Sequence, residues 1–182
     1  MSSPYQILLA DPARHAAEVA EIYRPAVETS VASFEEVAPG SAEMADRMRR
    51  VLAWAPWLVA LEGDEVIGYA YATRHRERAG YRWSVDMSAY VRGDRHGRGV
   101  GRRLYDELLG RLRAQRFVNV YAGITLPNPA SVGLHSAIGM RRVGVYRRIG
   151  YKFGAWHDVA WYTLRLREPE DPPEEPIPLS PV

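Results

Sequence analysis

Three glycines at alternate positions, Gly97, Gly99 and Gly101, open the segment with the clearest chemical pattern in the sequence. Glycines let successive backbone N–H groups turn toward an anion without a side chain in the way. Apolar residues then recur every four positions from Val100, which predicts a helix to about residue 116. The start of a helix carries roughly half a positive charge, so the segment predicts a pyrophosphate site. Four arginines add charge to it: Arg95, Arg98, Arg102 and Arg103.

Two other phosphate-binding motifs differ from this segment at defined positions. A P-loop ends in Gly-Lys-Ser/Thr, and that ending is missing here. The dinucleotide fingerprint G-x-G-x-x-G, counted from Gly97, needs a glycine where Arg102 stands. The plain structural alternative is a glycine-rich turn beside a solvated basic helix face.

Composition limits the class of protein. The chain has 182 residues, 47% of them hydrophobic, which fits one compact domain with a buried core. Its net charge of +2 lacks the field of a general nucleic-acid binder. No stretch reaches the ~20 apolar residues of a membrane span, and no signal-peptide pattern is present. Because there is no cysteine, disulfides, thiolate metal sites and a thiol nucleophile are excluded, and we expect a cytoplasmic enzyme.

Alternating helical and extended patterns predict a mixed order of helices and strands without internal repeats. Besides the helix after the glycines, helices are expected from an Asp11 cap to Ala26, from a Ser41 cap to about Trp54, and over residues 128–138. Strands are expected at residues 5–10, 57–62, 65–72, 83–91, 118–124, 143–149 and 159–166. The polar stretch 74–82 is expected to be a loop over a site.

The glycine segment His96-Gly-Arg-Gly-Val-Gly101 is similar to the acyl-CoA pyrophosphate loop of the GNAT superfamily, Gln/Arg-x-x-Gly-x-Gly/Ala. His96 stands where that pattern has glutamine or arginine. Within the superfamily, the chain resembles phosphinothricin and methionine sulfoximine acetyltransferases over nearly its whole length. The other matching segments are Pro56-Trp-Leu-Val-Ala60, Tyr81-Arg-Trp-Ser-Val-Asp86, Leu126-Pro-Asn128, Ser131-Val-Gly-Leu-His135, Gly150-Tyr-Lys-Phe-Gly154 and Trp156-His-Asp-Val159.

The resemblance implies an α/β (α+β) GNAT fold: a mixed, strongly twisted sheet of about seven strands flanked by helices, with splayed central strands. It assigns residues 1–167 to the acetyltransferase domain. Residues 168–182, with six prolines and five acidic residues, are expected to form an extended tail without chemistry. The strand 83–91 is expected to carry a bulge whose free backbone groups bind pantetheine and the thioester carbonyl.

The co-substrate that the resemblance implies is acetyl-CoA, and no metal is implied. Asn128 could either cap its helix or reach pantetheine, and both roles stay open at this point. The positions that match cofactor-binding residues are Ala89, Tyr90, Val91, His96, Gly97, Arg98, Gly99, Val100, Gly101, Arg102, Asn128 and Ser131.

Acetyl transfer to an amine requires the uncharged amine, and therefore a general base. Asp86, in an apolar strand, matches a position where the resembling enzymes carry glutamate; a buried ion pair is the structural alternative. His135 could accept the amine proton or protonate the departing sulfur, since an unperturbed imidazole has a pKa of ~6.5. No residue is set up as a covalent nucleophile, so we expect direct attack in a ternary complex.

The acceptor is expected to be an anionic, glutamate-like amino acid such as phosphinothricin or methionine sulfoximine. Arg76 and Arg78 match positions that hold its acidic groups, and arginine suits paired oxygens. Phe34, Tyr81 and Tyr90 are expected to wall its aliphatic part. The alternatives are ordinary exposed loop charge for the arginines and core packing for the aromatic residues.

Other functions remain open from sequence. Within enzymes, the acceptor could be another amine or a protein N-terminus. Outside enzymes, the chain could sense acyl-CoA without turnover, or bind nucleic acid through the eight arginines between Arg92 and Arg116. We expect neither nucleic acid nor membrane as a partner, and the resemblance implies a homodimer. Trp156, His157 and Asp158 are expected to be structural, with the tryptophan buried.

Overall fold

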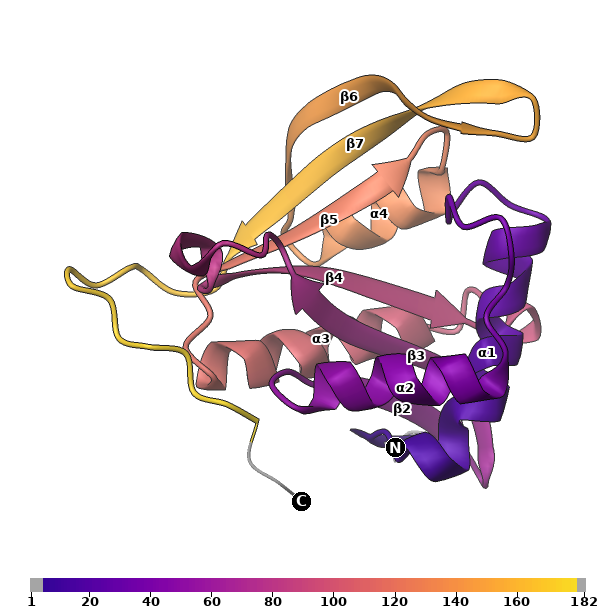
Figure 1. Ribbon diagram of the computed structural model, residues 1–182, viewed down its shortest axis with the longest axis horizontal. Coiled ribbons are helices and arrows are strands. Elements are labelled where there is room, and N and C mark those ends of the chain that lie inside the picture. Colours follow the sequence, from indigo (N-terminus) through magenta and orange to yellow (C-terminus); the bar gives the residue numbers. More distant parts are fainter. Residues whose placement is uncertain (1–4, 180–182) are drawn as a thin grey trace.

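The computed structural model describes residues 5–179, and within them seven strands form one sheet in the order β1-β2-β3-β4-β5-β7-β6 (Figure 1). The strands are β1 (Gln6–Leu9), β2 (Trp57–Glu62), β3 (Glu65–Arg74), β4 (Ser84–Val91), β5 (Asn119–Thr125), β6 (Arg141–Lys152) and β7 (Ala155–Arg165). The helices are α1 (Pro12–Glu28), α2 (Ser41–Leu52), α3 (Val100–Ala114) and α4 (Pro129–Ala137), with short 3₁₀ turns η1 (Ala79–Tyr81) and η2 (Gly93–Arg95). The predicted mixed fold is confirmed.

The centre of the sheet opens between β4 and β5. These two strands are parallel and pair only from Ser84–Asn119 to Asp86–Tyr121, whereas every other neighbouring pair is antiparallel. Beyond Asp86 the edge of β4 therefore has no strand partner. The sheet splays as predicted, and the opening begins at the candidate base.

The predicted bulge in β4 is wrong. Its register with β3 runs unbroken from Gly68–Val91 to Arg74–Val85, and the register shifts of the sheet lie in the β2–β3 and β6–β7 pairs instead. Backbone groups of β4 become free because β5 diverges from it, and no inserted residue is needed.

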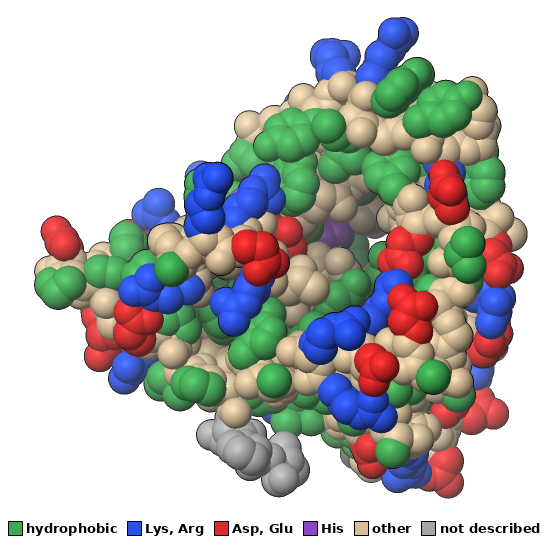
Figure 2. All heavy atoms as spheres, in the orientation of Figure 1, with side chains coloured by type: hydrophobic (Ala, Val, Ile, Leu, Met, Phe, Trp, Pro, Cys, Tyr) green, Lys and Arg blue, Asp and Glu red, His purple; other side chains and the backbone are tan. Residues whose placement is uncertain are grey.

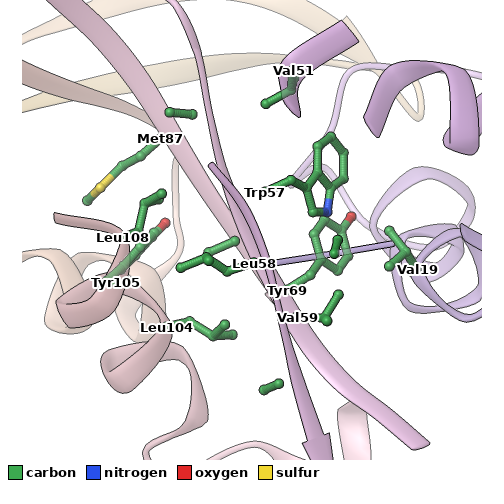
Figure 3. Close-up of a cluster of buried hydrophobic side chains, with 14 of the residues drawn as sticks. Val19, Val51, Trp57, Leu58, Val59, Tyr69, Met87, Leu104, Tyr105 and Leu108 are labelled. Atoms are coloured by element: carbon green, nitrogen blue, oxygen red, sulfur yellow. The ribbon is translucent and has the colours of Figure 1, made fainter. Parts of the chain in front are cut away.

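Helices cover the sheet on both faces, with α1 and α2 on one and α3 and α4 on the other (Figure 1). Figure 3 shows Val19 and Trp57 on the first side and Leu104 and Leu108 on the second. Burying each such aliphatic side chain contributes about 1.5–3 kcal/mol. Gly68 lets α3 approach β3 closely, because a Cβ there would lie 3.3 Å from side-chain atoms of Leu104 and Val100.

The first helix begins as predicted: the side chain of Asp11 accepts a hydrogen bond from the N–H of Ala13, and Pro12 occupies the first turn. The second helix does not begin as predicted. Gly40 is its N-cap and Ser41 its first residue, with no side-chain cap bond. The serine stands one position too late, so its hydroxyl does not serve the cap.

The last two strands form a longer hairpin than predicted, with its turn at Phe153 and Gly154, both at positive φ. The sequence indicates only 143–149 and 159–166 because the tip is rich in glycine and polar residues. Lys152 ties this hairpin to the last turn of α1 and the chain after it, where its Nζ donates to the carbonyls of Val27, Ser30 and Ser33 at 2.6, 3.0 and 2.7 Å.

The described part of the tail forms no helix or strand, as predicted; residues 180–182 of that prediction lie outside the described residues. It nevertheless packs on the domain. The indole N–H of Trp83 donates to the carbonyl of Glu174, and Arg82 pairs with Glu175. The backbone N–H of Ile177 donates to the carbonyl of Gln115 at 2.9 Å. None of the helices described is long and apolar enough to cross a membrane.

Candidate active site

The glycine-rich turn has the backbone conformation that its sequence predicts. Gly97 and Gly99 have φ of 74° and 77°, and Gly99 is the N-cap of α3. No atom lies within 4 Å of a Cβ built on either residue, so glycine is required there by conformation and not by space. The turn therefore presents the first N–H groups of α3 to an open region, which is the arrangement that an anion needs.

His96 replaces the expected glutamine or arginine with a contact inside the protein. Its Nε2 donates to the carbonyl oxygen of Val91 at 2.9 Å. This bond joins the end of β4 to the start of the turn. His96 therefore helps to hold the turn against the strand.

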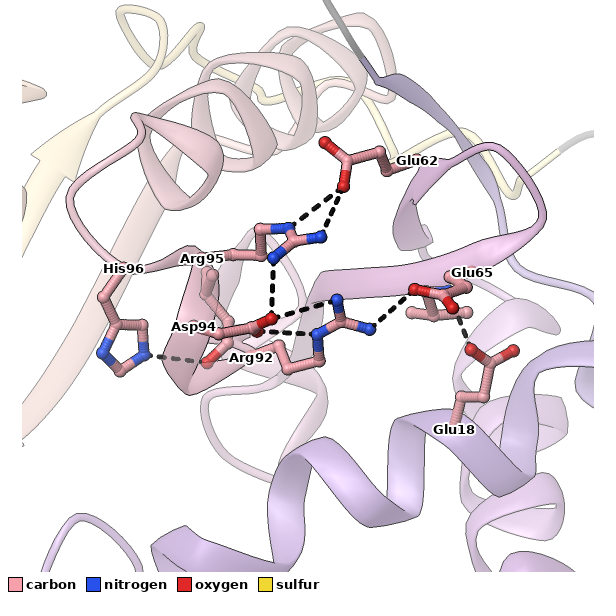
Figure 4. Close-up of polar contacts among 9 residues, drawn as sticks. Glu18, Glu62, Glu65, Arg92, Asp94, Arg95 and His96 are labelled. Carbon is pink, nitrogen blue, oxygen red and sulfur yellow. Dashed lines mark hydrogen bonds and ion pairs between the residues drawn. The ribbon is translucent and has the colours of Figure 1, made fainter.

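The arginines around the turn are less available than the sequence suggests. Figure 4 shows Arg95 bonded to Glu62 and Asp94, and Arg92 bonded to Asp94 and Glu65. Because these carboxylates neutralise the two guanidinium groups, Arg95 does not add the free charge predicted for it.

On the helix, Arg102 bonds to Asp106 and to the carbonyl of Ala137, which fastens α3 to α4. Arg103 lies over the ring of Tyr5. Arg98 is exposed and makes no hydrogen bond or ion pair to another residue of the described chain. Helix N–H groups and Arg98 are thus available to meet a phosphate.

A cleft of about 500 Å³ runs from this turn along β4 to α4. Two backbone hydrogen bonds on the β3 side show which groups of β4 face the cleft. The N–H of Arg92 donates to the carbonyl of Ile67, and the carbonyl of Ser84 accepts from the N–H of His75. Since backbone directions alternate along a strand, the N–H and C=O groups of Met87, Ala89 and Val91 point toward the opening. The lining includes Ala89, Val91, Gly99, Val100, Gly101 and Ser131.

Tyr90 is placed differently from its two neighbours. By the same alternation its backbone faces β3, where its carbonyl lies 3.1 Å from a Cβ built on Gly68. Its ring packs against Tyr23 and Tyr69, with centroids 4.9 and 5.4 Å away. The backbone of Tyr90 is thus turned away from the opening, while its ring belongs to an aromatic cluster on the α1 face.

Asn128 caps α4: its Oδ1 accepts the backbone N–H of Ser131 at 3.0 Å. Both residues also line the cleft. The cap accounts for the amide oxygen of Asn128 and leaves its amide nitrogen for another partner.

His135 is buried and fixed in one tautomer. Its Nδ1 lies 2.7 Å from the carbonyl oxygen of Ser131, which can only accept, so Nδ1 carries the proton. Its Nε2 then accepts from the hydroxyl of Tyr105 at 3.2 Å. Burial lowers the pKa of His135, which favours the neutral ring. The sequence did not single out Tyr105, because it lies in the apolar stripe of α3.

Asp86 has a partner that the sequence did not single out either. Nδ1 of His75, the residue after β3, lies 2.7 Å from Oδ1 of Asp86. Burial raises the pKa of the Asp86 carboxyl, and the bond to His75 holds the rise back. The imidazole of His75 stacks on Tyr121 at 4.4 Å.

The sheet separates the two predicted catalytic residues. Asp86 and His75 lie with Tyr121 on one face, while His135 lies with Tyr105 and Tyr162 on the other. They do not contact one another. The opening between β4 and β5 connects the two faces, so each residue can serve one side of a reaction that occurs in the opening.

The predicted acceptor residues are brought together only in part. Arg76 donates to the carbonyl of His75, and the ring of Tyr81 lies 6.4 Å from that imidazole. Arg78 is exposed next to Tyr81. Phe34 lies instead at the hairpin, 6.2 Å from His157. Figure 2 shows a hollow in this face below the hairpin, with apolar side chains above it and charged ones below.

Trp156 is 59% exposed, so its predicted burial is wrong. It lies near the hairpin tip, where its ring packs edge-on against Tyr151. Its neighbours are structural as predicted: His157 Nε2 donates to the carbonyl of Lys152, and Asp158 accepts from the N–H of Arg148. In residues 5–179 no three acidic or histidine side chains gather as a metal site would require.

Comparisons with known proteins agree with this geometry. The acetyltransferase (GNAT) domain model matches residues 13–161. Phosphinothricin N-acetyltransferase of Alcaligenes faecalis is 41% identical over 143 residues, which cover 78% of this chain and 73% of that protein. L-methionine sulfoximine/L-methionine sulfone acetyltransferase of Pseudomonas paraeruginosa is 36% identical over 150 residues, 80% of this chain and 86% of that protein.

Among solved structures, the GNAT superfamily phosphinothricin acetyltransferase of Sinorhizobium meliloti in complex with AcCoA superimposes with a TM-score of 0.84. It is 36% identical, and the match covers 90% of this chain and 89% of that one. With the family model spanning most of the domain, the chain belongs to the GNAT family of acetyltransferases.

Proposed function

We propose that this acetyltransferase moves the acetyl group of acetyl-CoA to the primary amine of a small glutamate-like amino acid, with phosphinothricin and methionine sulfoximine as acceptors. The observation that carries the proposal is the opening after Asp86. It has an anion-binding helix start and a cleft on one side and a half-buried carboxylate on the other. The amine attacks the thioester directly, since none of the described residues around the opening is arranged as a covalent nucleophile.

The fit to acetyl-CoA rests on the cleft. The N–H groups at the start of α3 suit the pyrophosphate. The backbone groups of Met87 and Ala89 and the N–H of Val91, which have no strand partner, suit the amides of pantetheine. Ser131 and the Asn128 amide nitrogen lie further along the same cleft. The relatives of known structure include a complex with AcCoA, which supports this assignment.

The two sides of the opening suit different steps. Asp86 lies on the face of the acceptor arginine Arg76, so this side removes the amine proton. His135 and Tyr105 lie on the cleft side, where the Tyr105 hydroxyl holds its one proton against Nε2 of His135. It protonates the departing sulfur by exchanging that hydrogen bond for one to the thiolate. The neutral state of His135 fits this role.

An anionic acceptor is supported by the arginines of the 75–83 loop. Arg76 and Arg78 are both exposed beside the Asp86 side, where guanidinium groups can pair with carboxylate or phosphinate oxygens. The names of two relatives, a phosphinothricin and a methionine sulfoximine acetyltransferase, agree with this acceptor class.

Association into a homodimer is supported by the hairpin. Single exposed apolar side chains are ordinary, whereas several on one hairpin make that hairpin a candidate interaction surface. Six large apolar side chains on β6, β7 and their turn are 49–60% exposed: Val143, Tyr146, Ile149, Tyr151, Phe153 and Trp156. Sedimentation of the wild type and of a Tyr151→Lys, Trp156→Lys variant tests this surface, and a monomeric wild type would contradict the dimer.

The test of the acceptor is release of free CoA thiol from acetyl-CoA with phosphinothricin, methionine sulfoximine and a panel of ordinary amino acids. We expect the two glutamate analogues to react with the highest kcat/KM, and Arg76→Gln to raise the KM for them. If acetyl-CoA binds but another amine is preferred by tenfold or more, the acceptor class is wrong while the acetyltransferase assignment stands.

A further inference from the structure

His75 has the geometry of a base and not only of a structural partner. At neutral pH the Asp86 carboxylate can only accept a hydrogen bond, so the 2.7 Å contact requires the proton on Nδ1 of His75. The lone pair of the neutral ring is then on Nε2. Within residues 5–179, Nε2 of His75 makes no hydrogen bond to another protein group.

The ring of His75 is held on several sides. It stacks on Tyr121 of β5, meets the edge of Trp161 at 6.1 Å, and lies 6.4 Å from Tyr81 of η1. The side chain is nevertheless 15% exposed, and that of Asp86 is 25% exposed. The charged and titratable groups that face the ring are therefore Asp86, Arg76, Tyr81 and Tyr121.

The position of the ring extends the reach of Asp86. An aspartate is one methylene shorter than the glutamate of the resembling enzymes, and its Oδ1 is already occupied by His75. The imidazole lies between the carboxylate and residues of the loop that are candidate acceptor residues: Arg76 donates to the His75 carbonyl, and the ring of Tyr81 lies 6.4 Å away. The second nitrogen of that ring makes no hydrogen bond to the described protein, whereas one oxygen of the carboxylate is already bonded to the ring, so Nε2 is the free basic position of the pair.

We infer that His75 Nε2 takes the proton from the acceptor ammonium, and that Asp86 is its positioning partner. This inference rests on the proposed function and names the base within it. The ammonium gives one proton to Nε2, which passes it to solvent. The amine nitrogen then bonds to the acetyl carbon as the C–S bond breaks and sulfur takes the electron pair. The second proton that nitrogen loses balances the one that sulfur gains.

His135 does not compete for this step. Its Nδ1 proton is fixed by Ser131, and its Nε2 is occupied by Tyr105 on the opposite face of the sheet. The two histidines therefore lie on opposite faces of the sheet. His75 is on the side of the amine, and His135 is on the side of the sulfur.

The test compares two replacements of His75. In His75→Asn the side-chain amide can still donate to Asp86 but offers no basic nitrogen, so it separates positioning from proton transfer. We expect kcat to fall about 10²-fold or more, the Kd for acetyl-CoA to stay within about twofold, and the ascending limb of the kcat–pH profile to shift. A rate within about threefold of wild type would overturn the inference.

Chemical rescue gives a second readout. Added imidazole should raise the rate of the His75→Ala variant at least tenfold. Pyrazole, which has the same shape but is a far weaker base, should not raise it. Equal rescue by both compounds would show that His75 only fills space.

The third readout needs no acceptor. Nitrogen NMR of the enzyme with acetyl-CoA should show the proton of the neutral His75 ring on Nδ1 and the lone pair on Nε2, and a neutral ring with its proton on Nε2 would overturn the inference. Wild-type enzyme that shows this tautomer but acetylates none of the tested amines would contradict the proposed acceptor class, not the base.

Discussion

The ring of Phe34 fills the space that a side chain at residue 150 would need, because a Cβ built on Gly150 would lie 2.3 Å from Cζ of Phe34. Phe34 belongs to the connection between α1 and α2, and Gly150 to β6. The ring of Phe34 can therefore lie against β6 at this point only because residue 150 has no side chain.

Replacing Gly150 with alanine should displace Phe34. We expect the KM for the acceptor to rise severalfold while the Kd for acetyl-CoA is unchanged, because the acyl-CoA cleft lies elsewhere. Gly144→Ala is the control, since it lies on the same strand and no atom is within 4 Å of its built Cβ. Equal acceptor kinetics in both variants would remove Phe34 from the acceptor site.

Gly99→Ala should weaken acetyl-CoA binding. Its φ of 77° costs an alanine roughly 1–2 kcal/mol, so the turn would relax and its N–H groups would move. We expect the Kd for acetyl-CoA from calorimetry to rise about tenfold. Gly93→Ala, at a glycine without positive φ and with open space, should bind as wild type does. Unchanged affinity in Gly99→Ala would exclude the turn as the pyrophosphate site.

Tyr105→Phe should reduce turnover and stability together. The change removes the hydroxyl that bonds to Nε2 of His135 and leaves a buried acceptor unpaired, which costs about 1–3 kcal/mol. If the hydroxyl also protonates sulfur, kcat should fall tenfold or more with an amine acceptor and unchanged acetyl-CoA affinity. Loss of stability in urea unfolding with full kcat would leave Tyr105 a structural role alone.

His15 should make the fold sensitive to acid. Burial, followed by the charge of Arg14, lowers its pKa, and its Nδ1 accepts the N–H of Asp11 at 2.9 Å. As the pH falls, His15 is protonated in the unfolded chain before it is protonated in the folded chain. The free energy of unfolding therefore decreases as the pH falls below about 6.5, the ordinary pKa of histidine, toward the lower pKa of the folded chain. The free energy of unfolding should fall less between pH 7.5 and 5.5 in His15→Gln than in wild type. Parallel slopes would contradict this.

Lys152→Met should loosen the connection that carries Phe34. Three backbone carbonyls lose their shared donor, at about 1–3 kcal/mol for each group left unpaired and buried. We expect a lower urea midpoint and a higher KM for the acceptor. Arg147→Met, at an 84% exposed side chain on the same strand, is the control. Matching stabilities in the two variants would show that water replaces the ammonium group.

The parts of the site that could be predicted from sequence are local ones. The glycine turn, its helix and the Asn128 cap each depend on residues within a few positions of one another. His75 could not be found in this way, because its bond to Asp86 depends on the β3–β4 register, in which Thr73 is the partner of Asp86. From sequence alone, His75 is one more polar residue in a polar loop.

The ion pairs of the arginines could not be predicted from sequence for the same reason. Arg95 lies next to the glycines in sequence, but its main partner is Glu62, 33 residues away on β2. A sequence shows that an arginine is present and does not show whether it is neutralised. The bulge was wrong on similar grounds, since whether backbone groups of β4 are paired depends on where β5 runs, which no residue within β4 determines.

The described tail runs back along the domain and is fastened to the two residues that precede β4, Arg82 through Glu175 and Trp83 through Glu174. The loop that carries Arg76 and Arg78 thus ends at an anchor supplied by the far end of the chain. Anything that pulls on the carboxyl terminus, such as a fused domain, a surface tether or a protease cut after residue 167, acts through this anchor on the loop over the acceptor side. The described tail is therefore a poor place for an attachment that is intended to leave the acceptor side unchanged.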